Sequence, residues 1–104
     1  MIEYTEGIYN YYVYIITNKN KTVLYTGVTN NVKRRLKEHK EKINPKSFAV
    51  RYNVEFLVYF EHFTWIDLAI AREKEIKSLS RDKKEFLIKE MNPDLNFLNH
   101  LFDW

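Results

Sequence analysis

The sequence contains no cysteine, only two glycines and two prolines in 104 residues, and no long apolar run. Without cysteine, disulfides, thiol catalysis and cysteine-bound zinc are excluded. So few glycines and prolines, beside 45% hydrophobic and 30% charged residues, exclude a collagen-like, low-complexity or disordered chain. The apolar runs are too short to span a membrane, and the N-terminus lacks the profile of a secretory signal. We therefore expect a soluble cytoplasmic protein.

Aromatic residues make up 16% of the chain, which is ample material for a hydrophobic core. The length allows one domain, and no repeat, linker or break in composition divides residues 1–104. We therefore expect a single domain.

Positive charge is concentrated in the middle of the chain. Residues 31–51 hold eight Lys and Arg against two Glu, a balance of +6, whereas the whole chain carries +3. Such a segment favours a polyanionic partner, nucleic acid first. The alternative is a solvated helix face, and charge alone does not separate the two.

Six elements follow from the pattern of apolar residues and turns. Aromatic and β-branched runs predict strands at 11–17, 22–27 and 54–60. Helical spacing predicts helices at 31–43, 65–79 and 81–91, with Asn30 or Asn31, Thr64 and Ser80 as their N-caps. Asn44-Pro45 and Asn92-Pro93 are expected to end the first and third helices. This β-β-α-β-α-α order predicts an α/β fold with a small three-stranded antiparallel sheet flanked by helices.

The first predicted helix carries ionisable groups on the side that should face the sheet. At 100° per residue, Val32, Leu36 and Ile43 form one stripe. His39 falls inside that stripe and Arg35 at its margin. A half-buried histidine with satisfied hydrogen bonds and an arginine whose stem covers apolar surface are the structural alternatives.

The second predicted helix repeats this feature. Ile66, Ala69, Ile70 and Ile76 define its apolar stripe, and Glu73 lies near the centre of that stripe. Burying an unpaired carboxylate is costly, so the pattern indicates a cation, a metal or a functional use. A buried ion pair between Glu73 and Arg35 is the structural alternative, whereas Glu75 should face outward.

The predicted hairpin adds two phenols. With residues 18–21 as a plain four-residue loop, Thr17 faces Thr22 and Tyr14 faces Tyr25 on one side of the sheet. Ordinary aromatic packing is the alternative for this pair. Gly27 lies just beyond Tyr25, where it could allow a close approach of a ligand or backbone.

These residues match a known family. The stretches YYVYIITNKNKTVLYTGVTNNVKRRLKEH, VEFLVYFE and AIAREKEIKSLSRDKKEFLI resemble the GIY-YIG nuclease domain, in the same order and spacing. The chain looks most like the short stand-alone bacterial members and the N-terminal nuclease domain of excision-repair enzymes. The resemblance covers about residues 10–92 and leaves 93–104 as a tail. The two motifs are Tyr12-Val13-Tyr14 and Tyr25-Thr26-Gly27, whereas the literal Gly7-Ile8-Tyr9 lies too far from the second motif.

The resemblance assigns roles to individual positions. The two motif tyrosines, the catalytic arginine, the position one helical turn after it and the metal-binding glutamate correspond to Tyr14, Tyr25, Arg35, His39 and Glu73. Several members of the family have an active-site asparagine about twelve residues beyond the glutamate, where this chain has a glutamate. Either Asn92 fills that role or the role is vacant.

The activity that the resemblance implies is hydrolysis of DNA phosphodiester bonds by a one-metal endonuclease. Glu73 would hold Mg²⁺ or Mn²⁺, and Arg35 would neutralise the growing phosphoryl charge. Tyr14 would assist the attack of water, with nearby positive charge favouring its phenolate. Double-stranded or branched DNA would be held through its phosphates, without sequence choice, by Lys33, Arg34, Lys37, Lys40 and Lys46.

Two other functions fit the same sequence. One is a nucleic-acid-binding module that keeps the fold with little or no turnover. The other is an interaction protein whose inward polar groups form only a buried network. Phe97, Leu98, Leu101, Phe102 and Trp104, apolar residues of the tail, could also build a homodimer contact.

Overall fold

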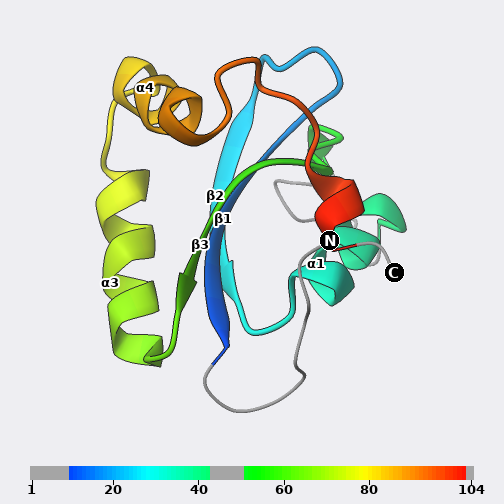
Figure 1. The fold of residues 1–104 in the computed structure, drawn as a ribbon. Coiled ribbons are helices and arrows are strands. Elements are labelled where there is room, and N and C mark those ends of the chain that lie inside the picture. The colour runs from blue at the N-terminus through cyan, green and yellow to red at the C-terminus, as the bar shows by residue number, and fades with distance from the viewer. Residues whose placement is uncertain (1–9, 43–50, 103–104) are drawn as a thin grey trace.

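The computed structural model describes residues 10–42 and 51–102 and has the predicted α/β architecture (Figure 1). Its elements are β1 (Tyr11–Thr17), β2 (Leu24–Thr29), α1 (Val32–Lys40), β3 (Phe56–Phe63), α3 (Ile66–Lys77), α4 (Arg81–Met91) and the 3₁₀ helix η1 (Asn99–Leu101). The prediction of a small antiparallel sheet flanked by helices is confirmed. None of the helices in these two ranges is long and apolar enough to cross a membrane.

The three strands form an antiparallel sheet in the order β2-β1-β3. The central strand β1 is covered on both faces, which explains why all but its first residue are buried. Figure 1 shows α1 and η1 on one side of the sheet and α3 with α4 on the other. We call these sides the α1 face and the α3 face.

Alternation along β1 divides its side chains between two cores. On the α1 face, Tyr12, Tyr14 and Ile16 pack in one cluster with residues of α1 and of the C-terminal segment. On the α3 face, Val13 and Ile15 pack in a second cluster with residues of α3 and α4. The sheet therefore separates two apolar layers, and a side chain's position in its strand decides which helices it meets.

The hairpin register differs from the predicted one by two residues. Tyr14 pairs with Gly27 and Ile16 with Tyr25, so the two tyrosines are diagonal neighbours and not directly opposed. The loop is longer because the Asn18 side chain holds it together. Its Oδ1 accepts hydrogen bonds from the backbone N–H groups of Thr22 (2.8 Å) and Val23 (3.1 Å). A shift of two residues leaves Tyr14 and Tyr25 on the same face.

Helix boundaries differ from the predicted ones at two points. Asn31 is the N-cap of α1, with its side chain accepting from Arg34 N at 2.9 Å, but α1 ends at Lys40 and not at residue 43. Lys42 follows in the left-handed region with φ 56°, which no helix continues. The predicted stop at Asn44-Pro45 lies outside the described residues.

Of the two N-caps predicted for α3 and α4, one is correct and one is wrong. Thr64 does not cap α3, because the N-cap position is Trp65 and makes no side-chain cap hydrogen bond. Ser80 caps α4 as predicted, with its hydroxyl accepting from Lys83 N at 3.3 Å.

The C-terminal segment packs on its own chain. Phe102 is buried against Tyr12 and Phe60, with ring centroids at 5.7 and 5.2 Å, and Leu98 and Leu101 pack against the same cluster. Phe97 stacks on Phe56 of β3 at 4.3 Å between ring centroids. The proposed homodimer contact therefore finds no support in these four tail residues. Trp104 lies outside the described part of the chain.

Candidate active site

Four of the predicted site residues meet on the α1 face. Tyr14 comes from β1, Tyr25 from β2, and Arg35 and His39 from successive turns of α1. The His39 ring lies between the phenols, with its centroid 6.4 Å from that of Tyr14 and 6.0 Å from that of Tyr25. Val32 and Leu36 anchor the helix in the core beside them. The predicted inward orientation of His39 is confirmed, since this side chain is buried.

Gly27 has a definite packing reason in this arrangement. It is the direct partner of Tyr14 across the hairpin, and the hydroxyl end of the Tyr14 ring lies next to it. A Cβ at residue 27 would stand 2.5 Å from Tyr14 Cζ and 3.0 Å from Tyr14 Cε1. The sequence predicts that Gly27 allows a close approach of a ligand or of backbone. In the structure it is the Tyr14 phenol that approaches Gly27.

Replacing Gly27 with alanine should displace the Tyr14 ring. We expect a destabilisation of about 1–3 kcal/mol, the usual cost of overpacking a well-packed core. Urea unfolding followed by circular dichroism measures it. In a Tyr14→Leu background the shorter side chain does not reach over residue 27, so the same substitution should cost much less. Equal costs in the two backgrounds would contradict this packing.

The cluster holds buried polar atoms without hydrogen-bond partners. Tyr14 Oη, Arg35 Nε and His39 Nε2 are all buried and unsatisfied. The guanidinium of Arg35 donates from Nη1 to Glu38 Oε1 at 3.1 Å, and it also lies close enough to Tyr14 for each group to influence the pKa of the other. Unsatisfied buried groups cost about 1–3 kcal/mol each, so three of them at one place indicate groups reserved for a ligand.

Burial sets the protonation states of the cluster. It raises the pKa of Tyr14, although the nearby Arg35 charge opposes this shift. It lowers the pKa of His39, and Arg35 lowers that pKa further, with Glu38 opposing. At neutral pH the protein thus holds a neutral phenol and a neutral imidazole. The predicted preference for a Tyr14 phenolate is not what the protein's own residues produce, because burial outweighs the guanidinium.

Glu73 lies in the other layer of the fold. It lies on α3, which packs its Ala69 and Ile76 against the α3 face, whereas Arg35 belongs to the α1 face. The Glu73 side chain is only 14% exposed, as its helical phase predicts, and its carboxylate pairs with Lys77 Nζ at 3.4 Å. Arg35 is paired with Glu38, so the predicted alternative of a Glu73–Arg35 ion pair is not formed.

The stripe around Glu73 is narrower than predicted. Ile66 and Ile70 lie at its margin and are exposed, so only Ala69 and Ile76 of the four predicted apolar residues are buried. Glu75 faces outward as expected, with its side chain 62% exposed and paired with Arg72.

Glu73 can hold a divalent metal only as a hydrated ion. No group of three or more His, Asp or Glu able to hold an ion occurs within residues 10–42 and 51–102. A hydrated Mg²⁺ needs only one or two protein carboxylates, because it keeps several waters and takes phosphate oxygens as ligands. The half-exposed Lys77 can release the carboxylate at little cost. The donor set therefore fits a hydrated ion shared with a phosphate substrate.

Asn92 is used for structure. Its Nδ2 donates to the carbonyls of Val58 (3.0 Å) and Asn96 (2.8 Å), and its Oδ1 accepts from Asn96 N at 3.0 Å. The side chain is buried at the end of α4 and both amide hydrogens are bound. These bonds leave it no donor for a substrate, so its candidacy as the missing asparagine has no support in this geometry.

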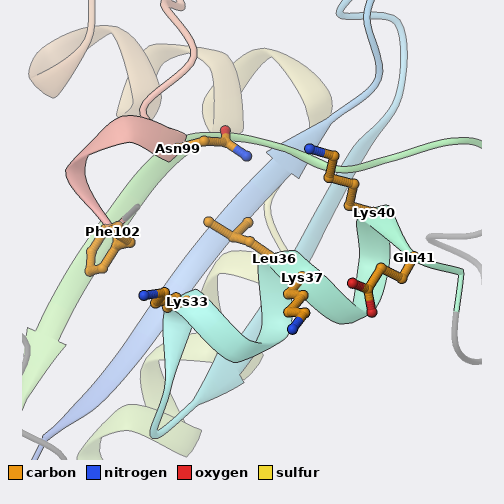
Figure 2. A pocket seen from close by; sticks show the side chains of 7 residues that line it. All are labelled: Lys33, Leu36, Lys37, Lys40, Glu41, Asn99 and Phe102. Carbon is orange, nitrogen blue, oxygen red and sulfur yellow. The ribbon is translucent and has the colours of Figure 1, made fainter. Parts of the chain in front are cut away.

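The predicted phosphate-binding residues lie around the outer side of α1. Lys33, Lys37 and Lys40 line a cavity of about 360 Å³ between α1 and the C-terminal segment (Figure 2). Arg34 points outward and its guanidinium is 3.8 Å from Glu38. Lys46 lies outside the described residues. Leu36, Glu41, Asn99 and Phe102 complete the lining. Asn99 and Phe102 could not be predicted as cavity residues from the sequence, because the tail carries only an apolar pattern.

Comparison with known proteins now decides the family. Residues 10–86 match the family model of the GIY-YIG catalytic domain. The chain belongs to the GIY-YIG nuclease family. The GIY-YIG match begins after Gly7-Ile8-Tyr9 and includes Tyr12-Val13-Tyr14, which agrees with the reading of the literal tripeptide as no part of the motif.

Several short GIY-YIG relatives resemble the whole domain. The chain is 46% identical over 81 residues to a UPF0213 protein of Natronomonas pharaonis, covering 78% of this chain and 93% of that one. It is 42% identical over 86 residues to a UPF0213 protein of Haloquadratum walsbyi, covering 83% and 93%. The solution NMR structure of a UPF0213 protein from Bacillus halodurans superposes with a TM-score of 0.52 at 36% identity, covering 82% of this chain and 88% of that chain.

Proposed function

We propose that this protein is a metal-dependent endonuclease that hydrolyses phosphodiester bonds in DNA. The observation that carries the proposal is the cluster on the α1 face, where a phenol, a guanidinium and an imidazole present buried atoms without partners. A phosphodiester and its attacking water supply acceptors and donors of the kind these atoms lack. Membership of a nuclease family makes nucleic acid the natural source of that phosphate.

Arg35 binds and neutralises the scissile phosphate in this proposal. Burial lowers the pKa of its guanidinium, but Tyr14 and Glu38 together raise that pKa by more than burial lowers it. The group therefore stays charged. Its free Nε can join a bidentate contact with two phosphate oxygens. Glu73 belongs to the opposite face of the sheet from Arg35, so a divalent ion held there would supply Lewis-acid chemistry only to a substrate that reaches both residues past an edge of the sheet.

His39 is the proton acceptor that the electrostatics favour. Its pKa is lowered by burial and then by Arg35, so the imidazole is neutral at pH 7 with Nε2 unsatisfied. Tyr14 keeps its proton and can donate a hydrogen bond to a phosphate oxygen or to the attacking water. Tyr25 borders the same ring and helps to fix it in place. This assigns the Tyr-assisted attack to a neutral phenol beside a neutral imidazole.

Nicking of supercoiled plasmid DNA tests the function directly. The purified protein should convert supercoiled plasmid to open circles with Mg²⁺ or Mn²⁺, and EDTA should stop the reaction. If the protein binds the plasmid but leaves it uncut with either ion, it is the alternative, a binding module with the same fold. The glutamate at position 85, where the family has asparagine, is the feature that favours this alternative.

The rate of nicking should depend on pH through His39. Because burial lowers the pKa of His39 from its usual 6.5, the rate should fall only on the acid side of neutrality and stay level from pH 7 to pH 9, where the raised pKa of Tyr14 keeps that phenol protonated. The groups that face His39 are Arg35 and Glu38 on α1, Tyr14 on β1 and Tyr25 on β2. His39→Gln should remove the acid limb. A rate that rises about tenfold per pH unit between pH 7 and 9 would instead indicate a tyrosine phenolate as base.

A further inference from the structure

The two sides of α1 carry different kinds of cation. Arg35 lies beside Tyr14 on one flank, whereas Lys33, Lys37 and Lys40 line the cavity on the other. At 100° per residue these lysines stand about 140–160° around the helix axis from Arg35. We call the lysine side, with Asn99 and Phe102 opposite, the lysine cleft. Figure 2 shows Leu36 pointing into it, with Lys33 and Lys40 near its two ends.

The lysine cleft is a strongly positive concave surface. Its lining holds three ammonium groups against the single carboxylate of Glu41. Among the described residues neither Lys37 nor Lys40 takes part in an ion pair, unlike Arg34 and Arg35, which both pair with Glu38. With two more ammonium groups than carboxylates around a cavity of about 360 Å³, the cleft has a positive potential that favours an anion.

A single strand cannot easily serve both flanks. An α-helix with its side chains is about 10–12 Å across, so a strand seated on Arg35 would have to cross the outer ridge of α1 to reach the cleft. A duplex presents two rows of phosphates on either side of its major groove, which is about 12 Å wide. The width of α1 matches that separation.

We propose that the lysine cleft binds the phosphates of the strand that is not cut, so that α1 lies in the major groove with Arg35 on the cleaved strand. The proposal rests on the proposed function, because it takes nucleic acid as the ligand. It deepens that function by assigning the two strands of a duplex to opposite flanks of α1. Arg34, on the ridge between the flanks, would face the bases.

A binding measurement in EDTA tests this proposal apart from cleavage. The probes are a fluorescently labelled duplex of about 20 base pairs and one of its single strands, each titrated with wild type and with Lys37→Gln/Lys40→Gln. Each lysine–phosphate contact adds about 0.9 to the slope of log affinity against log salt. The double variant should make that slope shallower by nearly two for the duplex, so its loss of duplex affinity relative to wild type should be about tenfold larger at 0.05 M salt than at 0.2 M salt. Single-strand binding should change less than twofold.

The matched control is Lys83→Gln/Lys89→Gln, which removes two exposed lysines from α4 in the other layer. It should leave duplex binding within twofold of wild type, and circular dichroism should show both variants folded. Equal losses for duplex and single strand, or equal losses for cleft and control variants, would overturn the proposal. If the wild-type protein binds neither probe, the proposed function fails as well. If wild type nicks plasmid but the cleft variant binds the duplex normally, only the cleft assignment fails.

Discussion

Arg35→Ala is expected to reduce plasmid nicking by about 10³-fold while the protein stays folded. Removing a cation or donor that acts on transition-state charge typically costs 10²–10³ in rate, and arginines in phosphoryl transfer contribute up to 10⁵. Arg35 is the guanidinium next to Tyr14, and no other described arginine shares that position. The measurement is the initial nicking rate of supercoiled plasmid at saturating Mg²⁺.

Two further variants separate charge from packing at this position. Arg35→Met keeps a long aliphatic side chain without the charge, so it should be about as stable as wild type yet as slow as the alanine variant. Arg35→Lys keeps the charge without the planar fork and should recover only part of the rate. Lys89→Ala, on exposed α4, serves as the control for a simple loss of positive charge. Cleavage that survives in the methionine variant would remove Arg35 from the chemistry.

Glu73→Gln is expected to lower nicking at least a hundredfold, because it removes the carboxylate proposed to hold the divalent ion. A metal supplies several kcal/mol of stabilisation to developing charge, which is larger than any single hydrogen bond in the site. Glutamine has nearly the same shape, and the ion pair it breaks joins the half-exposed Lys77, so the fold should not suffer. Nicking is measured over a range of Mg²⁺ and Mn²⁺ concentrations.

The matched control for Glu73 lies on the same helix. Glu75→Gln changes an exposed carboxylate two residues away that pairs only with Arg72 among the described contacts. It should nick at the wild-type rate. Binding of the labelled duplex in EDTA should be the same for both variants, because neither touches the lysine cleft. A Glu73→Gln variant that cuts as well as Glu75→Gln would place the ion elsewhere.

The elements and the inward-facing residues of α1 could be predicted because each follows from a local pattern. Alternation of apolar residues located β1, and a phase of 100° per residue placed His39 and Leu36 on the buried side of α1. These patterns describe which side of an element is buried. They carry no information on which layer of the fold each helix joins, so they could not show that Glu73 and Arg35, which the resemblance assigns to one active site, lie on helices packed against opposite faces of the sheet.

Other features depend on contacts between distant side chains or on burial depth. The hairpin register could not be predicted because the Asn18 side chain binds two loop N–H groups and lengthens the turn. The direction of the Tyr14 pKa depends on how deeply the phenol is buried, which only the assembled core determines. The packing of the tail could not be predicted from strand alternation or helical phase. An apolar side chain such as Phe102, which is buried here, can pack within its own chain or against a partner.

The contact between Tyr14 and Gly27 also restricts the register of the hairpin. Because side chains alternate between the two faces of the sheet, a slip of β2 by one residue would turn Tyr25 toward α3 and place Thr26 or Val28 opposite Tyr14. A slip by two residues would keep Tyr25 on the α1 face but place Tyr25 itself or Thr29 opposite Tyr14. In either case the new residue brings a Cβ to the position where it would collide with the Tyr14 ring. The glycine of the second motif therefore favours the one alignment in which the two phenols are diagonal neighbours.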